Sequence, residues 1–260
     1  MKLEILEYLP ELSSSQSSLL FIHGGSHGAW CWKENFLPYF SSKGFPSYAL
    51  SLRGHGESEG NESIHFFSLN DYMNDVLEVI SQLSEKPVLI GHSLGGALVQ
   101  KILCLYPEKI QAAVLMSTTP PDGMFRDFRR LLISRYKDIY QIRLFDKGKS
   151  RHMPPQVFFS PDLPAEKRDE YLGLLQPEST KAQRELMRRI VPRSVSVKVP
   201  LLILGSTQDW FFPGKTVATI GEKYKTEPVI FNNICHDMML DPNWRTVADQ
   251  ILPFLQKLAP

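Results

Sequence analysis

Residues 87–102 read PVLIGHSLGGALVQKI, and this stretch decides the fold. The apolar run Pro87–Ile90 predicts a buried strand, and the residues from Ala97 onward follow a helical pattern. The turn between them has the pattern G-x-S-x-G, with Ser93 at its centre. A strand before this pattern and a helix after it indicate a sharp turn that exposes the serine at a helix N-terminus. Small residues are needed on both sides of Ser93, because larger side chains would collide across the bend.

Outward from this turn, short apolar runs bounded by Gly or Pro recur along the chain. They are four to six residues long and lack strict alternation, so we expect parallel strands that are buried on both faces. Helical patterns separate them, and the last one closes the chain after residue 231. The sequence therefore predicts an α/β fold with a mostly parallel, doubly wound sheet. The predicted strands are Leu19–His23, Ser47–Leu52, Pro87–Gly91, Ala112–Ser117, Pro200–Gly205 and Pro228–Phe231.

One region interrupts the alternation of strand and helix. Residues 121–194 contain no convincing buried strand, and they carry 16 basic and 10 acidic side chains. Their net charge is thus +6, whereas the rest of the chain has a net charge of −5. We therefore expect residues 1–120 and 195–260 to form the core, with a helical cap inserted at 121–194.

Composition excludes several classes of protein. The chain of 260 residues has a net charge of +1, which disfavours nucleic acid as a partner. Its apolar runs are far shorter than the roughly 20 residues of a membrane span. Glu4 and Glu7 interrupt the segment where a signal peptide would be apolar, and the three cysteines form no CxxC pair. We expect a cytoplasmic protein that is a monomer or a homodimer.

A glycine-rich loop follows the first predicted parallel strand. It reads HGGSHG over residues 23–28. In a doubly wound sheet this loop lies beside the Ser93 turn, so the backbone N–H of Gly25 and that of Leu94 can together hold a developing oxyanion. We expect His23 and His27 to hold the loop by hydrogen bonds. No HExxH motif or cysteine cluster suggests a metal, so we expect no metal and no other cofactor.

An acid and a base follow later in the chain. Asp209 comes at the end of a predicted strand, where it can reach and orient an imidazole. His236 is in the loop after the last predicted strand, so the chain order is Ser93, Asp209, His236. Asp122, which follows the preceding strand, is the competing acid.

With these residues the sequence resembles the α/β-hydrolase superfamily. The resemblance covers residues 18–119 and 198–260, and residues 121–194 stand where that family carries a variable cap. Within it, FIHGGSHGAW at residues 21–30 is most similar to the branch of plant methylesterases and hydroxynitrile lyases. The resemblance implies an α/β-hydrolase fold with Ser93 as nucleophile, His236 as base and Asp209 as acid. It implies the amides of Gly25 and Leu94 as oxyanion hole.

Two differences from the hydroxynitrile lyases bear on the expected reaction. The lyases have Thr where Gly24 stands and Lys where Asp237 stands, so hydrolysis of a small carboxylic ester is expected. A lactonase, a C–C bond hydrolase, a thioesterase or a perhydrolase would use the same triad, and a non-catalytic receptor for small molecules is a further alternative. The side chains expected to line the substrate pocket are Ser26, Met124, Phe128, Trp210 and Phe211.

Overall fold

The computed structural model describes residues 1–12 and 16–258, which form a seven-stranded sheet with helices on both faces. The strand order is β1-β3-β2-β4-β5-β6-β7, and every neighbouring pair is parallel except β1 and β3. The strands are β1 (Ile5–Tyr8), β2 (Leu19–Ile22), β3 (Ser47–Leu50), β4 (Val88–His92), β5 (Ala112–Met116), β6 (Leu201–Ser206) and β7 (Val229–Phe231).

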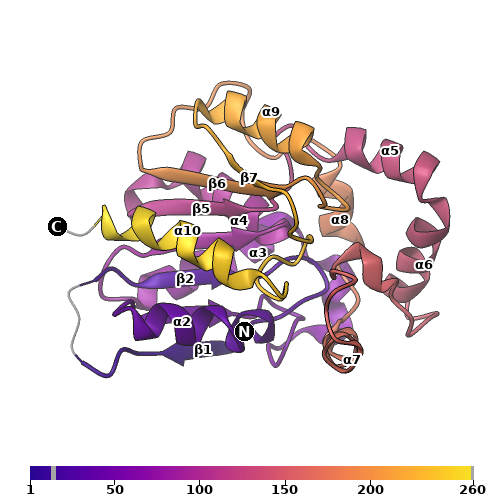
Figure 1. Cartoon of the computed structure of the whole chain (residues 1–260), viewed down its shortest axis with the longest axis horizontal. Helices are drawn as coiled ribbons and strands as arrows, with labels where there is room; N and C mark the ends of the chain where they lie inside the picture. Colours follow the sequence, from indigo (N-terminus) through magenta and orange to yellow (C-terminus); the bar gives the residue numbers. More distant parts are fainter. Residues whose placement is uncertain (13–15, 259–260) are drawn as a thin grey trace.

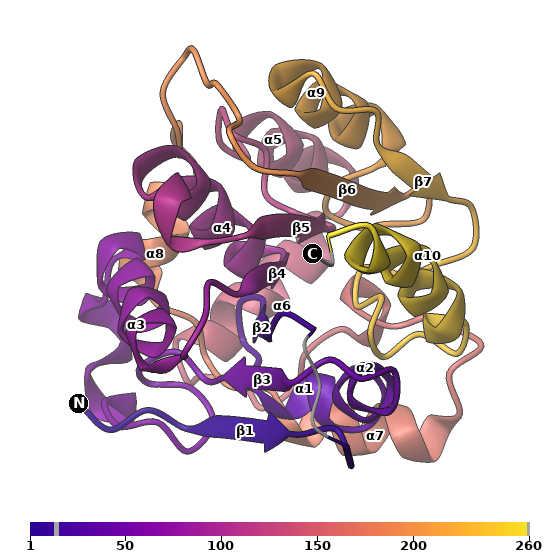
Figure 2. The ribbon, with the colours of Figure 1, turned by 90° about the vertical axis from the view of Figure 1, so that its left-hand side faces the viewer.

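The helices divide between the two faces of the sheet and one end of it. Figure 2 shows α3 and α4 on one face, with α2 and α10 on the other. The α-helices are α1 (Trp30–Lys33), α2 (Phe36–Ser42), α3 (Leu69–Gln82), α4 (Leu94–Leu105), α5 (Phe125–Ser134), α6 (Tyr136–Asp146), α7 (Ala165–Leu174), α8 (Thr180–Leu186), α9 (Gly214–Tyr224) and α10 (Trp244–Gln256). Short 3-10 helices occupy Asn61–Phe66, Pro107–Lys109 and Pro155–Val157.

The core consists of two apolar layers, one on each face of the sheet. Along β2, Leu19 and Phe21 pack against α2 and α10, whereas Leu20 and Ile22 pack on the side of α3, α4 and α9. All four side chains are fully buried. Because both faces of the central strands are covered, their sequences are continuously apolar rather than alternating.

The structure confirms the expected fold class and the six predicted strands. It adds β1, an edge strand that pairs antiparallel with β3 and whose residues are only partly buried. The segment between β5 and β6 holds α5 to α8 and no strand, and Figure 1 shows these helices gathered at one end of the sheet. Among the described residues, no helix is both long and apolar enough to cross a membrane.

Candidate active site

Ser93 lies at the sharp turn between β4 and α4. Its φ and ψ of 50° and −112° are a conformation that non-glycine residues rarely adopt, so the backbone is strained here. The glycines on either side make the turn possible. A Cβ on Gly91 would lie 2.6 Å from the carbonyl oxygen of Gly95, and a Cβ on Gly95 would collide with the carbonyl oxygens of Ile22 and His23. The tight turn thus holds the half-buried Ser93 at the N-terminus of α4.

His236 and Asp209 form a buried pair. The Nδ1 atom of His236 lies 2.8 Å from Oδ1 of Asp209, and the two residues are 2% and 5% exposed. The same carboxylate oxygen accepts hydrogen bonds from the amides of Phe211 and Phe212, at 2.8 and 2.9 Å. The turn after β6 therefore fixes the carboxylate, which in turn fixes the imidazole and leaves its Nε2 for proton transfer.

The imidazole of His236 also packs beside the residue that precedes Ser93. The rings of His92 and His236 have centroids 4.7 Å apart, and Nε2 of His92 donates to the carbonyl oxygen of His236 at 3.0 Å. Burial and the neighbouring His236 lower the pKa of His92 to about 3, so its ring is neutral. This contact links the loop after β7 to the end of β4.

The loop after β2 is held by two histidines, as the sequence predicted. The Nε2 atom of His23 accepts from the amide of Leu52 at 3.0 Å, so its proton is on Nδ1 and is donated to the carbonyl oxygen of Gly24 at 2.7 Å. Burial lowers the pKa of His23, which keeps this ring neutral. The peptide between Gly24 and Gly25 is therefore fixed in orientation. His27 donates to the carbonyl oxygen of Gly25 at 2.7 Å.

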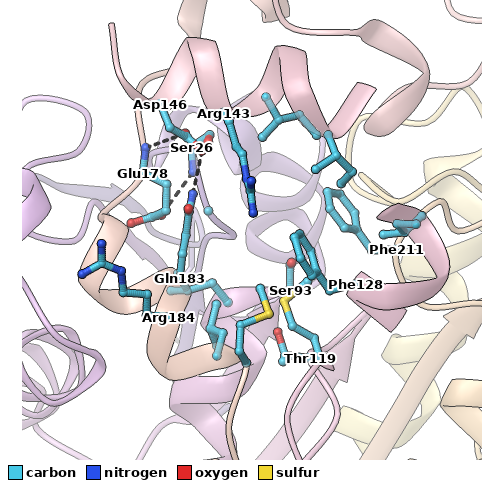
Figure 3. Close-up of a pocket in the computed structure, with 18 of the residues that line it drawn as sticks. Ser26, Ser93, Thr119, Phe128, Arg143, Asp146, Glu178, Gln183, Arg184 and Phe211 are labelled. Carbon is cyan, nitrogen blue, oxygen red and sulfur yellow. Dashed lines mark hydrogen bonds between the residues drawn. The ribbon is translucent and has the colours of Figure 1, made fainter. Parts of the chain in front are cut away.

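A cavity of about 640 Å³ is lined by the loop after β2, the Ser93 turn and residues of α5, α6 and α8. It is lined by most residues expected at the site, and Figure 3 shows Ser93, Phe128 and Phe211 on one side of it. The expected residues among the lining are Gly25, Ser26, Ser93, Leu94, Met124, Phe128 and Phe211. Three aromatic residues of the lining surround the His236 ring, with centroids 4.7 Å away for Phe211, 5.9 Å for Phe212 and 6.2 Å for Phe158.

One expected pocket residue, Trp210, needs correction, and the competing acid, Asp122, lies elsewhere. Trp210 does not line the cavity; its ring packs against that of Phe211, which does, at 4.8 Å between centroids. Asp122, the competing acid, is exposed and forms an ion pair with Arg189 at 2.6 Å. His236 pairs with Asp209 instead.

Sequence reasoning missed several polar residues of the cavity. Glu178 and Asp146 are both buried at its wall, and Glu178 accepts from the amide of Ser26 at 3.3 Å. Arg143 and Gln183 also line it. Acidic residues in a helical, largely polar segment resemble solvent-exposed positions, so the sequence carries no signal that separates them from surface residues.

One group of side chains has the composition of a metal site. Ligand atoms of His92, His236 and Asp237 lie within 4.8 Å of one another. Hydrogen bonds engage all three groups, since His236 pairs with Asp209, Asp237 pairs with His27 at 2.8 Å, and His92 donates to the carbonyl oxygen of His236. The cluster thus belongs to the hydrogen-bond network around the His236 loop.

Comparisons with known proteins agree with this geometry. Residues 19–249 match the family model described as alpha/beta hydrolase family. Methyl jasmonate esterase 1 of Vitis vinifera is 30% identical over 188 residues, which cover 68% of each chain. A pFDCC methylesterase of Arabidopsis thaliana is 28% identical over 207 residues, or 74% of this chain and 77% of that protein.

Solved structures share the fold at lower identity. A monoacylglycerol lipase from Paleococcus ferrophilus superposes with a TM-score of 0.76 at 20% identity, covering 99% of this chain and 100% of that one. An esterase from Exiguobacterium antarcticum superposes with a TM-score of 0.74 at 17% identity, covering 98% and 95%.

The chain belongs to the alpha/beta hydrolase family. Its relatives within this family include plant methylesterases, which confirms the expected resemblance to that branch.

Proposed function

We propose that the protein is a serine hydrolase that cleaves a small carboxylic ester through an acyl-enzyme intermediate. The observation that carries this proposal is the buried Asp209–His236 pair, which is packed against the end of β4 beside the strained Ser93. A base oriented by an acid near an accessible serine hydroxyl is the arrangement that activates the hydroxyl as a nucleophile. An acyl chain has room in the cavity that Ser93 lines.

The proposed reaction has two half-reactions. His236 takes the proton of the Ser93 hydroxyl through Nε2 while the Ser93 oxygen forms a bond to the ester carbonyl carbon. The tetrahedral oxyanion is held by the amides of Gly25 and Leu94, and its collapse breaks the bond to the alcohol oxygen, which His236 protonates. Water then attacks the acyl-enzyme in the same way and releases the carboxylic acid. The imidazolium formed in each half is stabilised by Asp209.

The positions of the two amides support their role in this proposal. Leu94 is the first residue of α4, and the first N–H groups of a helix have no partner within it. Gly25 lies on the loop that His23 and His27 hold, and both Gly25 and Leu94 line the same cavity as Ser93. Donors fixed in advance cost no reorganisation when the charge develops.

The relatives favour an ester as the substrate. Their names specify a methyl jasmonate esterase and a pFDCC methylesterase, and we infer a small ester for this chain too.

Residue 24 has little room for a side chain. Gly24 lies against His92 and Ser93, where an added Cβ would lie 2.7 Å from Nδ1 of His92 and 3.1 Å from Cβ of Ser93. We infer that residues 121–194 cap the cavity and choose the substrate, and that the protein acts in the cytoplasm as a monomer or homodimer.

A substrate panel tests this function. The panel holds methyl and p-nitrophenyl esters of increasing acyl length, with lactones, thioesters and a β-diketone. We expect the highest kcat/KM for esters, with hydrolysis lost in Ser93→Ala. Preference for a lactone, thioester or diketone would overturn the ester assignment, and binding without turnover would favour a receptor.

A further inference from the structure

The cavity beside Ser93 carries more basic than acidic side chains in its wall. Four basic residues line it, compared with two acidic ones. Within residues 1–12 and 16–258, none of the four forms an ion pair with a carboxylate of the protein. They are Arg143, Lys147, Arg184 and Arg188.

The two acids of the wall are already engaged elsewhere. Glu178 accepts a hydrogen bond from the hydroxyl of Tyr72 at 2.9 Å and lies 3.2 Å from Nε2 of His55. Asp146 accepts from the amide of Glu178 at 3.1 Å and from the side chain of Gln183 at 2.7 Å. Both carboxylates are buried in these networks and form no ion pair with the four basic residues, so basic side chains outnumber acidic ones in the cavity wall by four to two.

Arg143 is positioned to bind an anionic ligand in the cavity. It extends from α6 into the cavity, as Figure 3 shows, and its guanidinium carbon lies 5.6 Å from the centroid of the Phe128 ring. Contact with an aromatic face holds a guanidinium while its N–H groups remain free to donate. Phe128 itself lines the same cavity as Ser93. The chain thus sets a planar, multiply donating cation in the same cavity as the serine that we assign as nucleophile.

We propose that the preferred substrate carries a free carboxylate in addition to its ester group. This carboxylate binds to Arg143 while Ser93 attacks the ester carbonyl. This inference rests on the proposed function and names its substrate class: half-esters of dicarboxylic acids. Arginine matches a carboxylate with two parallel hydrogen bonds, which gives orientation as well as affinity. Lys147, Arg184 and Arg188, which are exposed like Arg143, also line the cavity and raise the local concentration of an anionic substrate.

The kinetic test uses substrates that differ only in charge. Monomethyl esters of succinic, glutaric and adipic acid are compared with methyl esters in which a carboxamide replaces the free carboxylate. The wild-type protein should show a kcat/KM about tenfold higher for the best carboxylate than for its carboxamide. This preference should shrink as ionic strength increases, because salt screens partly exposed charges.

Two variants distinguish a specific role of Arg143 from a general effect of the positive charge of residues 121–194. Arg143→Gln should remove the preference by lowering kcat/KM for the carboxylate esters only. Arg129→Gln is the matched control, since Arg129 is an exposed residue of α5 outside the cavity lining. Equal kcat/KM for the two substrate series would overturn the proposal, and so would an equal loss on both series in Arg143→Gln.

A binding measurement keeps this inference distinct from the proposed reaction. Calorimetry with Ser93→Ala protein needs no turnover, and the half-ester should bind about tenfold tighter than the carboxamide. Selective binding by Ser93→Ala without hydrolysis by the wild-type protein would contradict the proposed function and leave the carboxylate site standing. Ester hydrolysis that depends on Ser93 but is equally fast for carboxylate and carboxamide substrates would support the proposed function and overturn the carboxylate site.

Discussion

The Nε2 atom of His27 lies 2.8 Å from Oδ2 of Asp237, and both side chains are fully buried. The other ring nitrogen of His27 faces the carbonyl oxygen of Gly25 at 2.7 Å. Both nitrogens therefore face acceptors, which requires a protonated imidazole. Burial alone lowers the pKa of His27, but the attraction of Asp237 outweighs it and the pKa is raised. This ion pair joins the loop of Gly25 to the residue after His236.

Breaking this pair should destabilise the fold. We expect Asp237→Asn to lower the free energy of unfolding by about 3 kcal/mol, because a buried imidazolium would lose its counter-charge. Urea unfolding at pH 6 measures the change. Glu170→Gln, at an exposed pair with Lys167, is the control and should leave the free energy unchanged. Equal urea midpoints for Asp237→Asn and Glu170→Gln would contradict a stabilising ion pair between His27 and Asp237.

The contribution of this pair should depend on pH in a defined window. The pKa of His27 is raised above 6.5, so its contribution is complete below pH 6.5 and is lost as the pH rises through the folded-state pKa. For Asp237, burial raises the pKa but His27 outweighs this and lowers it below 3.8, so its contribution is lost only in stronger acid. The stability difference between wild type and His27→Gln should therefore be largest from about pH 4 to 6.5. A difference that grows above pH 6.5 would contradict this protonation state.

The choice between two acids can be tested by neutral replacements. Asp209→Asn should lower kcat by about 10⁴, because the amide stabilises the wrong imidazole tautomer. Asp122→Asn should keep nearly all activity, since Asp122 pairs with the exposed Arg189. Steady-state kinetics on the best ester measure both. A severe loss in Asp122→Asn with a mild one in Asp209→Asn would reverse the assignment.

The tight turn at Ser93 depends on the absence of a side chain at residue 95. Gly95→Ala should cost several kcal/mol of stability, because its Cβ would meet backbone carbonyl oxygens of β2 and the following residue, which cannot move easily. Gly173→Ala, in α7, has open space at the Cβ position and should be neutral or stabilising by about 0.5 kcal/mol. Thermal unfolding of both variants compares them. Similar melting temperatures would show that the turn tolerates a side chain.

Much of this architecture is predictable from sequence because the decisive signals are local. The strand, the G-x-S-x-G turn and the helix at residues 87–102 lie in one continuous stretch, and apolar runs mark the central strands. The partly buried edge strand Ile5–Tyr8 lacks that signal. Glu178 escaped prediction because its contacts join segments far apart in the chain, such as those with Ser26 and Tyr72. Trp210 was misplaced because a sequence does not show which of three adjacent aromatic residues faces a cavity.

The central claim is that Ser93 is a nucleophile activated by His236. A fluorophosphonate probe tests it directly, because such a reagent forms a covalent bond with an activated serine whatever the natural substrate. We expect one label on the wild-type protein, located at Ser93 by mass spectrometry of the peptides, with no label on Ser93→Ala and strongly slowed labelling of His236→Ala. Folded wild-type protein that stays unlabelled, or a label that persists in Ser93→Ala, would contradict the account.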